Sequence, residues 1–246
     1  MPPLAISHGR DLLVRVRTGS GKTLAYSLPV LHKIMQSDGD DSTGTSGGIQ
    51  AVVLVPTREL CAQVETAICN LLHYADHISV ATLVGATGTP ANQKALRARQ
   101  AVSLCDDPSL LIGTSSGILH HQSSLKLGNV QSLVIDEADL VLSFGYGKKV
   151  NELVRLLPYI CQGFILSATL GTEVESLKRN VLHSPAVLQL EEEEEIVTKK
   201  KKTLSQFYLP LTGKDKNLVL YVFLKLGLLK VKGLFFVIPG LDFVRK

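Results

Sequence analysis

Short runs of apolar residues alternate along most of this chain with longer segments whose apolar residues recur at helical spacing. The runs are nearly continuous in apolar residues, as is typical of strands in a parallel sheet covered on both faces. They occupy residues 11–16, 51–56, 78–84, 109–114, 132–136 and 163–169. The helical segments are Lys22–Gln36, Arg58–His73, Pro90–Gln100, Tyr146–Leu157 and Thr172–Leu182. This alternation predicts a doubly wound α/β fold with a parallel sheet.

Two polar segments interrupt the alternation. Residues 37–48 are rich in Gly, Ser and Asp, which predicts a mobile surface loop. Further on, "EEEEEIVTKKKK" places glutamates beside lysines, which predicts a solvated linker. The sequence after it reads as strand, helix, strand. We therefore expect a first domain over residues 1–190, a charged linker over 191–203 and the incomplete start of a second domain over 204–246.

Composition argues against a disulfide-rich, zinc-binding, membrane-spanning or secreted protein but does not identify a function. The net charge of +4 over 246 residues permits a polyanionic partner without requiring one. The four cysteines are scattered and form no C-x-x-C pair, which argues against a zinc site or a disulfide framework. No apolar stretch reaches transmembrane length and the N-terminus lacks the pattern of a signal peptide. We expect a soluble intracellular protein with no membrane partner.

A glycine-rich turn lies between the first predicted strand and the first predicted helix. It reads Thr18-Gly19-Ser20-Gly21-Lys22-Thr23. In such a loop, backbone N–H groups face the phosphates of a nucleotide, the lysine reaches the β- and γ-phosphates, and the threonine hydroxyl binds magnesium. The usual pattern begins with Gly, whereas this one begins with Val16. A Gly-Ser turn before Lys-Thr also occurs without a nucleotide, so this stretch alone leaves both interpretations open.

Two carboxylates end another predicted strand. Asp136 and Glu137 follow the apolar run "SLVI". The carboxyl ends of strands are where open α/β sheets bind ligands. Asp136 can hold magnesium, and Glu137 can orient or deprotonate an attacking water. The alternative is an N-cap aspartate followed by exposed acidic residues.

These residues match a known family. Asp136-Glu137-Ala138-Asp139 resembles the signature of the DEAD-box ATP-dependent RNA helicases. Residues 17–23 resemble motif I of that family, 56–60 motif Ia and 167–169 motif III, in the family's order. Together the four matches separate the chain from ABC-type and kinase-type P-loop proteins. Parts of the sequence most resemble the nucleolar subgroup that works in large ribosomal subunit assembly.

The resemblance implies a RecA-like first lobe, ATP and Mg²⁺ as cofactors, RNA as the partner (ribosomal precursor RNA in that subgroup), and a location in the nucleus and nucleolus. It also implies a role for each matching residue. The catalytic residues would be Lys22, Asp136 and Glu137, and the metal would be held by Thr23 and Asp136. The nucleotide would be held by Thr18, Gly19, Ser20, Gly21, Lys22 and Thr23, and its state would be coupled to domain closure by Asp139, Ser167 and Thr169. RNA would be contacted by Pro56, Thr57, Arg58, Gly85 and Thr114. Without the other motifs, Arg58 would read as a first-turn helix residue paired with Glu59 or solvent.

The sequence also departs from the family pattern. The family's adenine-reading Q motif would precede Met1, and its later motifs would follow "GLFFVIPG" at 233–240. Gly85-Ala86 replaces a Gly-Gly pair, and residues 114–117 read Thr-Ser-Ser-Gly where the family has Thr-Pro-Gly-Arg, an exchange that removes a phosphate-binding guanidinium. We therefore expect a truncated member of the helicase family. The alternative is a non-catalytic product that binds nucleotide or RNA weakly, or competes for partners of the full-length enzyme.

Overall fold

The structure is a computed structural model that describes residues 5–6, 9–16, 19–38, 48–189 and 215–227. Contacts divide the chain into two units, Met1–Glu192 and Glu193–Lys246. The first unit contains the sheet, and the described part of the second is helix α9 (Lys216–Lys225). The linker expected over 191–203 and the two strands expected in the second unit lie outside the described residues, so the domain boundaries stay a prediction.

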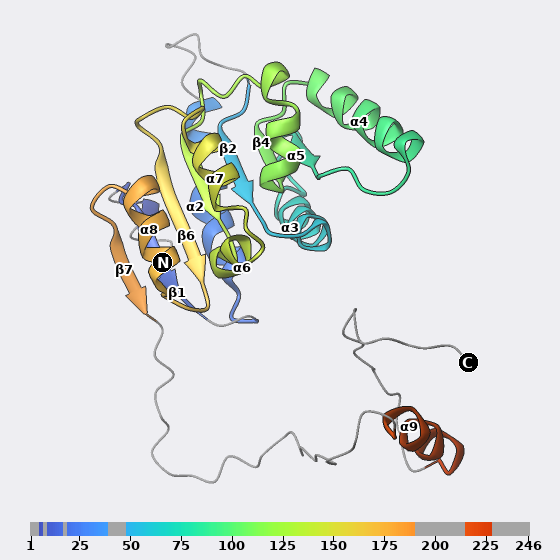
Figure 1. Cartoon of the computed structure of the whole chain (residues 1–246). Coiled ribbons are helices and arrows are strands. Elements are labelled where there is room, and N and C mark those ends of the chain that lie inside the picture. Colours follow the sequence, from blue (N-terminus) through green and yellow to red (C-terminus); the bar gives the residue numbers. More distant parts are fainter. Residues whose placement is uncertain (1–4, 7–8, 17–18, 39–47, 190–214, 228–246) are drawn as a thin grey trace. The chain divides into compact units, whose positions relative to one another are not determined.

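The first unit is built on a seven-stranded sheet in the order β3-β4-β2-β5-β6-β1-β7. Every neighbouring pair is parallel, which confirms the predicted α/β class (Figure 1). The strands are β1 (Leu12–Arg15), β2 (Ala51–Leu54), β3 (Val80–Leu83), β4 (Leu110–Gly113), β5 (Ser132–Ile135), β6 (Gln162–Ser167) and β7 (Ala186–Gln189).

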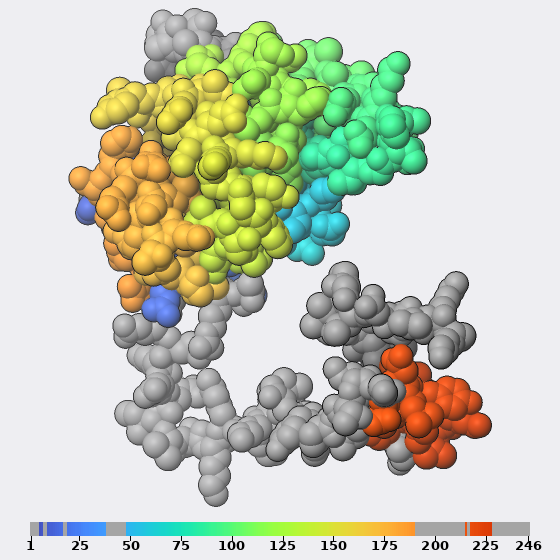
Figure 2. All heavy atoms as spheres, in the orientation of Figure 1, coloured from blue at the N-terminus to red at the C-terminus, as the bar shows by residue number. Residues whose placement is uncertain are grey.

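Helices cover both faces of this sheet. Helices α2 (Lys22–Asp38) and α3 (Arg58–Leu71) pack on one face. The opposite face, which Figure 2 shows covered by atoms of α7 and α8, carries α5 (Ser115–His120), α6 (Ala138–Ser143), α7 (Gly147–Val154) and α8 (Thr172–Val181). Helix α4 (Pro90–Cys105) contacts the edge strand β3, and a short 3-10 helix spans Gln122–Ser124. None of the described helices is long and apolar enough to cross a membrane.

The near-continuous apolar runs arise because each strand contributes to two cores. In β1, Leu12 and Val14 point into the cluster beneath α2 and α3, whereas Leu13 belongs to the opposite cluster. Strand β2 divides in the same way, with Val53 on the first side and Val52 on the second. This period-two alternation of burial is what a sheet covered on both faces requires.

Some predicted elements have other limits. Helix α2 continues to Asp38, so the loop expected over 37–48 begins later, and residues 39–47 lie outside the described residues. The short helices α5 and α6 and the strand β7 were not predicted. Six-residue helices are too short to display a helical period, and β7 is an edge strand whose four residues alternate between partly buried and exposed, with none fully buried.

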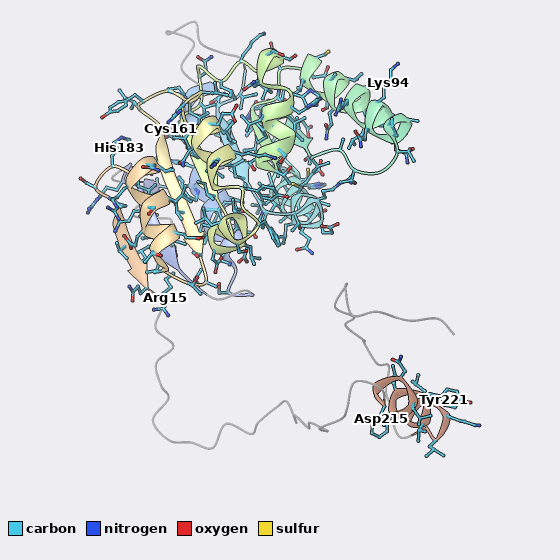
Figure 3. All side chains as sticks on the ribbon, in the orientation of Figure 1. Arg15, Lys94, Cys161, His183, Asp215 and Tyr221 are labelled. Atoms are coloured by element: carbon cyan, nitrogen blue, oxygen red, sulfur yellow. The ribbon has the colours of Figure 1, made fainter. Side chains whose placement is uncertain are left out.

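Because all seven strands run in one direction, their carboxyl ends meet at one edge of the sheet. Arg15 at the end of β1 pairs with Ser167 of β6, and Leu54 of β2 pairs with Gly113 of β4 and Ile135 of β5. Arg15 marks this edge in Figure 3, away from Lys94 on α4. Loops after β1, β5 and β6 therefore gather on one part of the edge, and loops after β2, β3 and β4 on the neighbouring part.

Candidate functional site

The turn between β1 and α2 has the backbone that a phosphate-binding loop needs. Gly19 and Gly21 lie in the left-handed region, with φ of +81° and +80°, where other residues are strained. Helix α2 begins directly after them at Lys22, so its first N–H groups face the turn. Thr18 lies outside the described residues. Val16 is buried, and its N–H donates to the Ser167 carbonyl at 3.0 Å, a backbone bond that does not depend on which side chain stands there.

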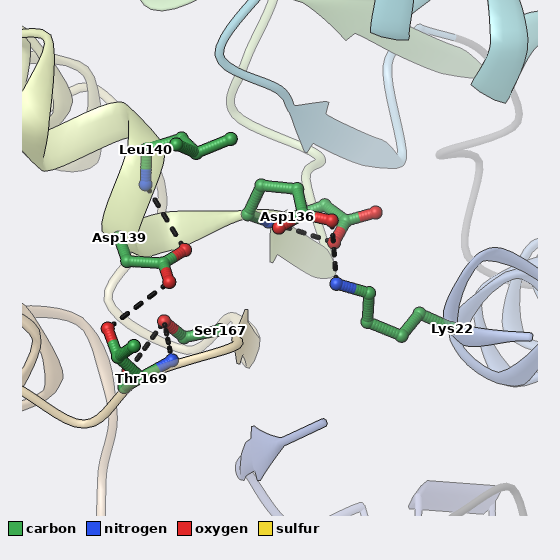
Figure 4. Close-up of polar contacts among 7 residues, drawn as sticks. Lys22, Asp136, Asp139, Leu140, Ser167 and Thr169 are labelled. Atoms are coloured by element: carbon green, nitrogen blue, oxygen red, sulfur yellow. Dashed lines mark hydrogen bonds and ion pairs between the residues drawn. The ribbon is translucent and has the colours of Figure 1, made fainter. Parts of the chain in front are cut away.

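Lys22 forms a buried ion pair with Glu137 beside this turn, and Figure 4 shows the Lys22 side chain reaching toward Asp136, the preceding residue. The Lys22 ammonium donates to Glu137 Oε1 at 2.7 Å, and the two side chains are 7% and 11% exposed. Together with residues of α3 they border a cavity of about 250 Å³, here called the nucleotide cavity. Its lining residues are Gly19, Gly21, Lys22, Thr23, Val55, Leu60, Gln63, Val64, Asp136 and Glu137. The structure thus brings the two predicted motifs into one cavity.

Glu137 has an unusual backbone conformation. Its φ and ψ are both +48°, in the left-handed region, at the N-cap of α6. For a residue with a Cβ this conformation costs on the order of 1–3 kcal/mol and is found most often at functional sites. The Glu137 N–H donates to Asp136 Oδ1 at 2.8 Å, which holds the turn in place. In this conformation the Glu137 carboxylate accepts the hydrogen bond from Lys22.

Asp136 combines burial with partial charge compensation. It is 5% exposed, and burial raises the pKa of its carboxyl above the ordinary value of 3.8, although the Lys22 charge acts in the opposite direction. Tyr26 is fully buried beside it, and burial followed by the Asp136 charge raises the pKa of that phenol. The Asp136 carboxylate and the Thr23 hydroxyl border the same cavity and are the oxygen ligands that Mg²⁺ accepts when phosphates and water complete its shell. The residues present therefore fit a nucleotide-bound Mg²⁺.

Asp139, Ser167 and Thr169 lie together at the ends of β5 and β6 (Figure 4). The Thr169 hydroxyl donates to Asp139 Oδ2 at 3.2 Å, and the Ser167 hydroxyl donates to the Thr169 carbonyl at 2.6 Å. Ser167 is fully buried, whereas Thr169 is exposed. The three residues thus connect the segment after Glu137 to the loop after β6.

The five residues predicted to contact RNA border a second cavity, of about 540 Å³, which we call the basic groove. They are Pro56, Thr57, Arg58, Gly85 and Thr114, from the ends of β2, β3 and β4. The Thr114 hydroxyl accepts hydrogen bonds from the N–H groups of Gly85 at 3.1 Å and Gly117 at 3.2 Å, so it joins two of these loops. Arg58 donates to the Thr87 hydroxyl. That bond holds the guanidinium at the groove.

Several residues of the basic groove were not found from the sequence. They are Arg97, Ser116, His120, Phe144, Tyr146 and Lys149. They belong to α4, α5 and the segment from the end of α6 into α7, and none of them lies in one of the four matching motifs. Packing of α4 on β3 and of α5 against α7 places these residues at the groove, and such packing has no sequence signal.

Gly117 occupies the position of the family's arginine but is buried in α5. A Cβ there would lie 2.5 Å from the Leu83 carbonyl oxygen. The backbones of α5 and β3 therefore approach too closely for any side chain at this position. The exchange of Arg for Gly does more than remove a charge, because it accompanies close packing of the helix on the strand.

We expect Gly117→Ala to destabilise the chain by about 1–3 kcal/mol, because overpacking forces the helix or strand to shift. Gly128→Ala is the matched control, since Gly128 has open space around its Cβ position. Urea unfolding measures both. Equal stability of the two variants would show that α5 and β3 separate at no cost, and Gly117→Arg would then be tolerated as well.

The stability of the chain should depend on pH through His121. This residue is buried next to Gln100, which borders the basic groove: His121 Nε2 lies 3.2 Å from Gln100 Oε1, and the Gln100 amide donates to the Val84 carbonyl at 3.1 Å. Burial, with help from His120 and Arg97, lowers the pKa of His121 below 6.5. The unfolded chain then binds a proton at a higher pH than the folded chain does. The contribution of neutral His121 to the free energy of unfolding is therefore complete above pH 6.5 and is lost as the pH falls through the folded-state pKa.

We expect His121→Gln to flatten this pH dependence, while His77→Gln, at an exposed position, keeps it. Urea midpoints at about pH 7.5 and 5.5 make the comparison. The attribution to His121 is wrong if its variant loses as much stability on acidification as the wild type.

Comparisons with known proteins agree with this geometry. Residues 2–177 match the family of DEAD/DEAH box helicases. The chain is 41% identical over 239 residues to the ATP-dependent RNA helicase dbp9 of Aspergillus niger, and 39% identical over 238 residues to the probable ATP-dependent RNA helicase ddx56 of Dictyostelium discoideum. Each alignment covers 96% of this chain but only 36% and 33% of the relative. The chain therefore spans about a third of the length of these curated relatives.

Among solved structures, a DEAD box protein from Methanococcus jannaschii matches with a TM-score of 0.61 and 26% identity. The match covers 77% of this chain and 48% of that one.

Proposed function

The chain belongs to the DEAD/DEAH box helicase family, and we propose that it supplies the ATP- and RNA-binding lobe of an ATP-dependent RNA helicase. In this proposal, binding and hydrolysis of ATP accompany local separation of RNA strands. The likeness to the nucleolar subgroup supports ribosomal precursor RNA as the substrate class and the nucleolus as the location.

The placement of two cavities on one sheet edge carries this proposal. The nucleotide cavity lies at the carboxyl ends of β1 and β5, and the basic groove lies at the ends of β2, β3 and β4. Strand β2 is hydrogen-bonded to both β4 and β5, so it joins the two parts of the edge. A phosphate-bearing ligand in one cavity and a polyanionic strand in the other would be bound by elements that share one rigid sheet.

Several of the groups that phosphoryl transfer to water uses border the nucleotide cavity, namely a lysine, two carboxylates and a threonine hydroxyl. Lys22 would exchange its ion pair with Glu137 for the β- and γ-phosphates, beside the N–H groups of Gly19 and Gly21. The released Glu137 carboxylate would then orient the attacking water and accept its proton. Mg²⁺, held by Thr23 and Asp136, would neutralise charge on the phosphates.

The basic groove has the groups that hold a single strand by its backbone. Arg58 provides positive charge, and the hydroxyls of Thr57 and Thr114, which accept hydrogen bonds from backbone N–H groups, can still donate to phosphate oxygens and 2′-hydroxyls. Asp139, Ser167 and Thr169 lie beside the nucleotide cavity and are the candidates for coupling the nucleotide to movement of a second lobe.

A separation-of-function experiment tests the proposal. Arg58→Ala should weaken binding of a labelled single-stranded RNA about 3- to 10-fold, lessen its salt dependence, and leave ATP affinity unchanged. Lys22→Ala should weaken ATP binding and leave RNA affinity and its salt dependence unchanged. If both variants lose both ligands equally, or if neither affects RNA, the assignment of two cavities to two ligands is wrong.

A further inference from the structure

We propose, on the basis of the function proposed above, that Phe144, Tyr146 and Lys149 form a second RNA-binding wall of the basic groove. In this arrangement Lys149 binds a backbone phosphate of single-stranded RNA and Phe144 stacks on a base. Tyr146 positions both. This wall comes from the segment that links α6 to α7 and from α7 itself, whereas Arg58 begins α3 after β2 and Thr114 follows β4.

Two contacts hold Lys149 at the groove. Its ammonium donates to the Ser116 hydroxyl at 2.7 Å and lies 5.4 Å from the centre of the Tyr146 ring. All three residues border the cavity that Arg58 and Thr114 also border. A hydroxyl and an aromatic ring orient the ammonium without removing its charge.

Within the described part of the chain, the charge of Lys149 is not paired with a carboxylate. Three lysines of the sheet unit do form such pairs: Lys22 with Glu137 at 2.7 Å, Lys126 with Asp107 at 3.0 Å and Lys178 with Glu175 at 3.2 Å. No carboxylate of the described residues lies within 4.0 Å of the Lys149 ammonium. An exposed, oriented and unpaired cation in a groove is suited to a phosphate.

Phe144 adds an apolar surface beside this cation. It is 53% exposed although it borders the groove, and its ring lies edge-on to Tyr146 with centroids 6.2 Å apart. An aromatic side chain next to positive charge is the combination that binds single strands without sequence preference, because every base has a stacking face. Single-stranded RNA therefore fits this wall better than a duplex, whose bases are already stacked.

The wall also accounts for the missing arginine at position 117. A side chain at Gly117 would clash with β3, so α5 cannot present a cation from that position. Ser116, its neighbour, instead accepts a hydrogen bond from Lys149 of α7. Positive charge therefore reaches the first turn of α5 from another helix, α7.

The test measures binding of a labelled ten-nucleotide single-stranded RNA to the full chain at several salt concentrations. Lys149→Gln should weaken binding about 3- to 10-fold and make the slope of log K against log salt shallower by about 0.7, the value for one phosphate contact. Lys148→Gln is the matched control, because Lys148 borders a different hollow, with Asn151 and Glu173. Phe144→Leu should weaken binding about fivefold with no change of slope, as loss of stacking without loss of charge requires.

Arg58→Ala separates failure of this inference from failure of the proposed function. If Arg58→Ala weakens RNA binding while Lys149→Gln and Phe144→Leu match the Lys148→Gln control, the second wall is wrong and the groove assignment stands. If Arg58→Ala has no effect either, the proposed RNA groove is itself wrong. A thermal unfolding midpoint for each variant confirms that the fold is intact.

Discussion

Lys22→Ala is expected to weaken ATP binding by about 10- to 150-fold. Hydrogen bonds to charged groups contribute about 1.5–3 kcal/mol, and Lys22 is the cation that borders the nucleotide cavity. Equilibrium titration with a fluorescent ATP analogue measures the effect. Lys33→Ala is the control on the same helix, because Lys33 donates to the Gln131 carbonyl at 3.1 Å, outside the nucleotide cavity.

The same substitution should destabilise the nucleotide-free chain. Removing Lys22 leaves the Glu137 carboxylate buried without its partner, which costs about 3–5 kcal/mol. The double variant Lys22→Met/Glu137→Gln removes both charges and should recover most of that stability while still binding ATP weakly. ATP affinity that returns with stability in the double variant would mean that Lys22 acts on folding alone.

Asp136→Asn is expected to abolish the magnesium dependence of ATP binding. For the wild type we expect chelation of Mg²⁺ to reduce ATP affinity at least about tenfold, or 1.4 kcal/mol. A neutral amide in place of the carboxylate is a far poorer ligand for Mg²⁺, so Asp136→Asn should bind ATP equally with and without the metal. Isothermal titration in magnesium and in chelator makes the comparison.

Glu137→Gln is the comparison variant for Asp136→Asn. It changes the adjacent carboxylate, which we assign to water rather than to the metal. It should keep the magnesium dependence and bind ATP at least as tightly as the wild type, because Lys22 is no longer tied to a charged partner. Loss of the magnesium dependence in Glu137→Gln, with retention in Asp136→Asn, would reverse the roles of the two residues.

The sequence pattern predicted the sheet because burial on both faces leaves a direct trace. Runs such as 51–56 are apolar at every position, since successive residues enter opposite cores. The nucleotide cavity was also predictable, because Gly19, Gly21 and Lys22 lie within four residues of one turn and Asp136 directly follows an apolar strand. Both features are local in the chain.

Features that depend on packing between distant elements could not be predicted. The left-handed backbone of Glu137 and its ion pair with Lys22 require the geometry of β1 and β5 across the sheet. Likewise, Lys149 reaches the basic groove only because α7 packs on α5, and the close approach at Gly117 follows from α5 lying against β3. No periodicity or motif records these contacts.

We propose that the carboxyl edge at β1 and β5 binds Mg²⁺ and ATP. Hydrogen–deuterium exchange of the full chain, with and without saturating Mg²⁺ and a non-hydrolysable ATP analogue, shows which segments the ligand protects. We predict that the nucleotide slows exchange at residues 19–26 and 136–140 and leaves α4 (Pro90–Cys105) unchanged. Unchanged exchange at residues 19–26, or protection confined to α4 and the amino ends of the strands, would contradict the claim.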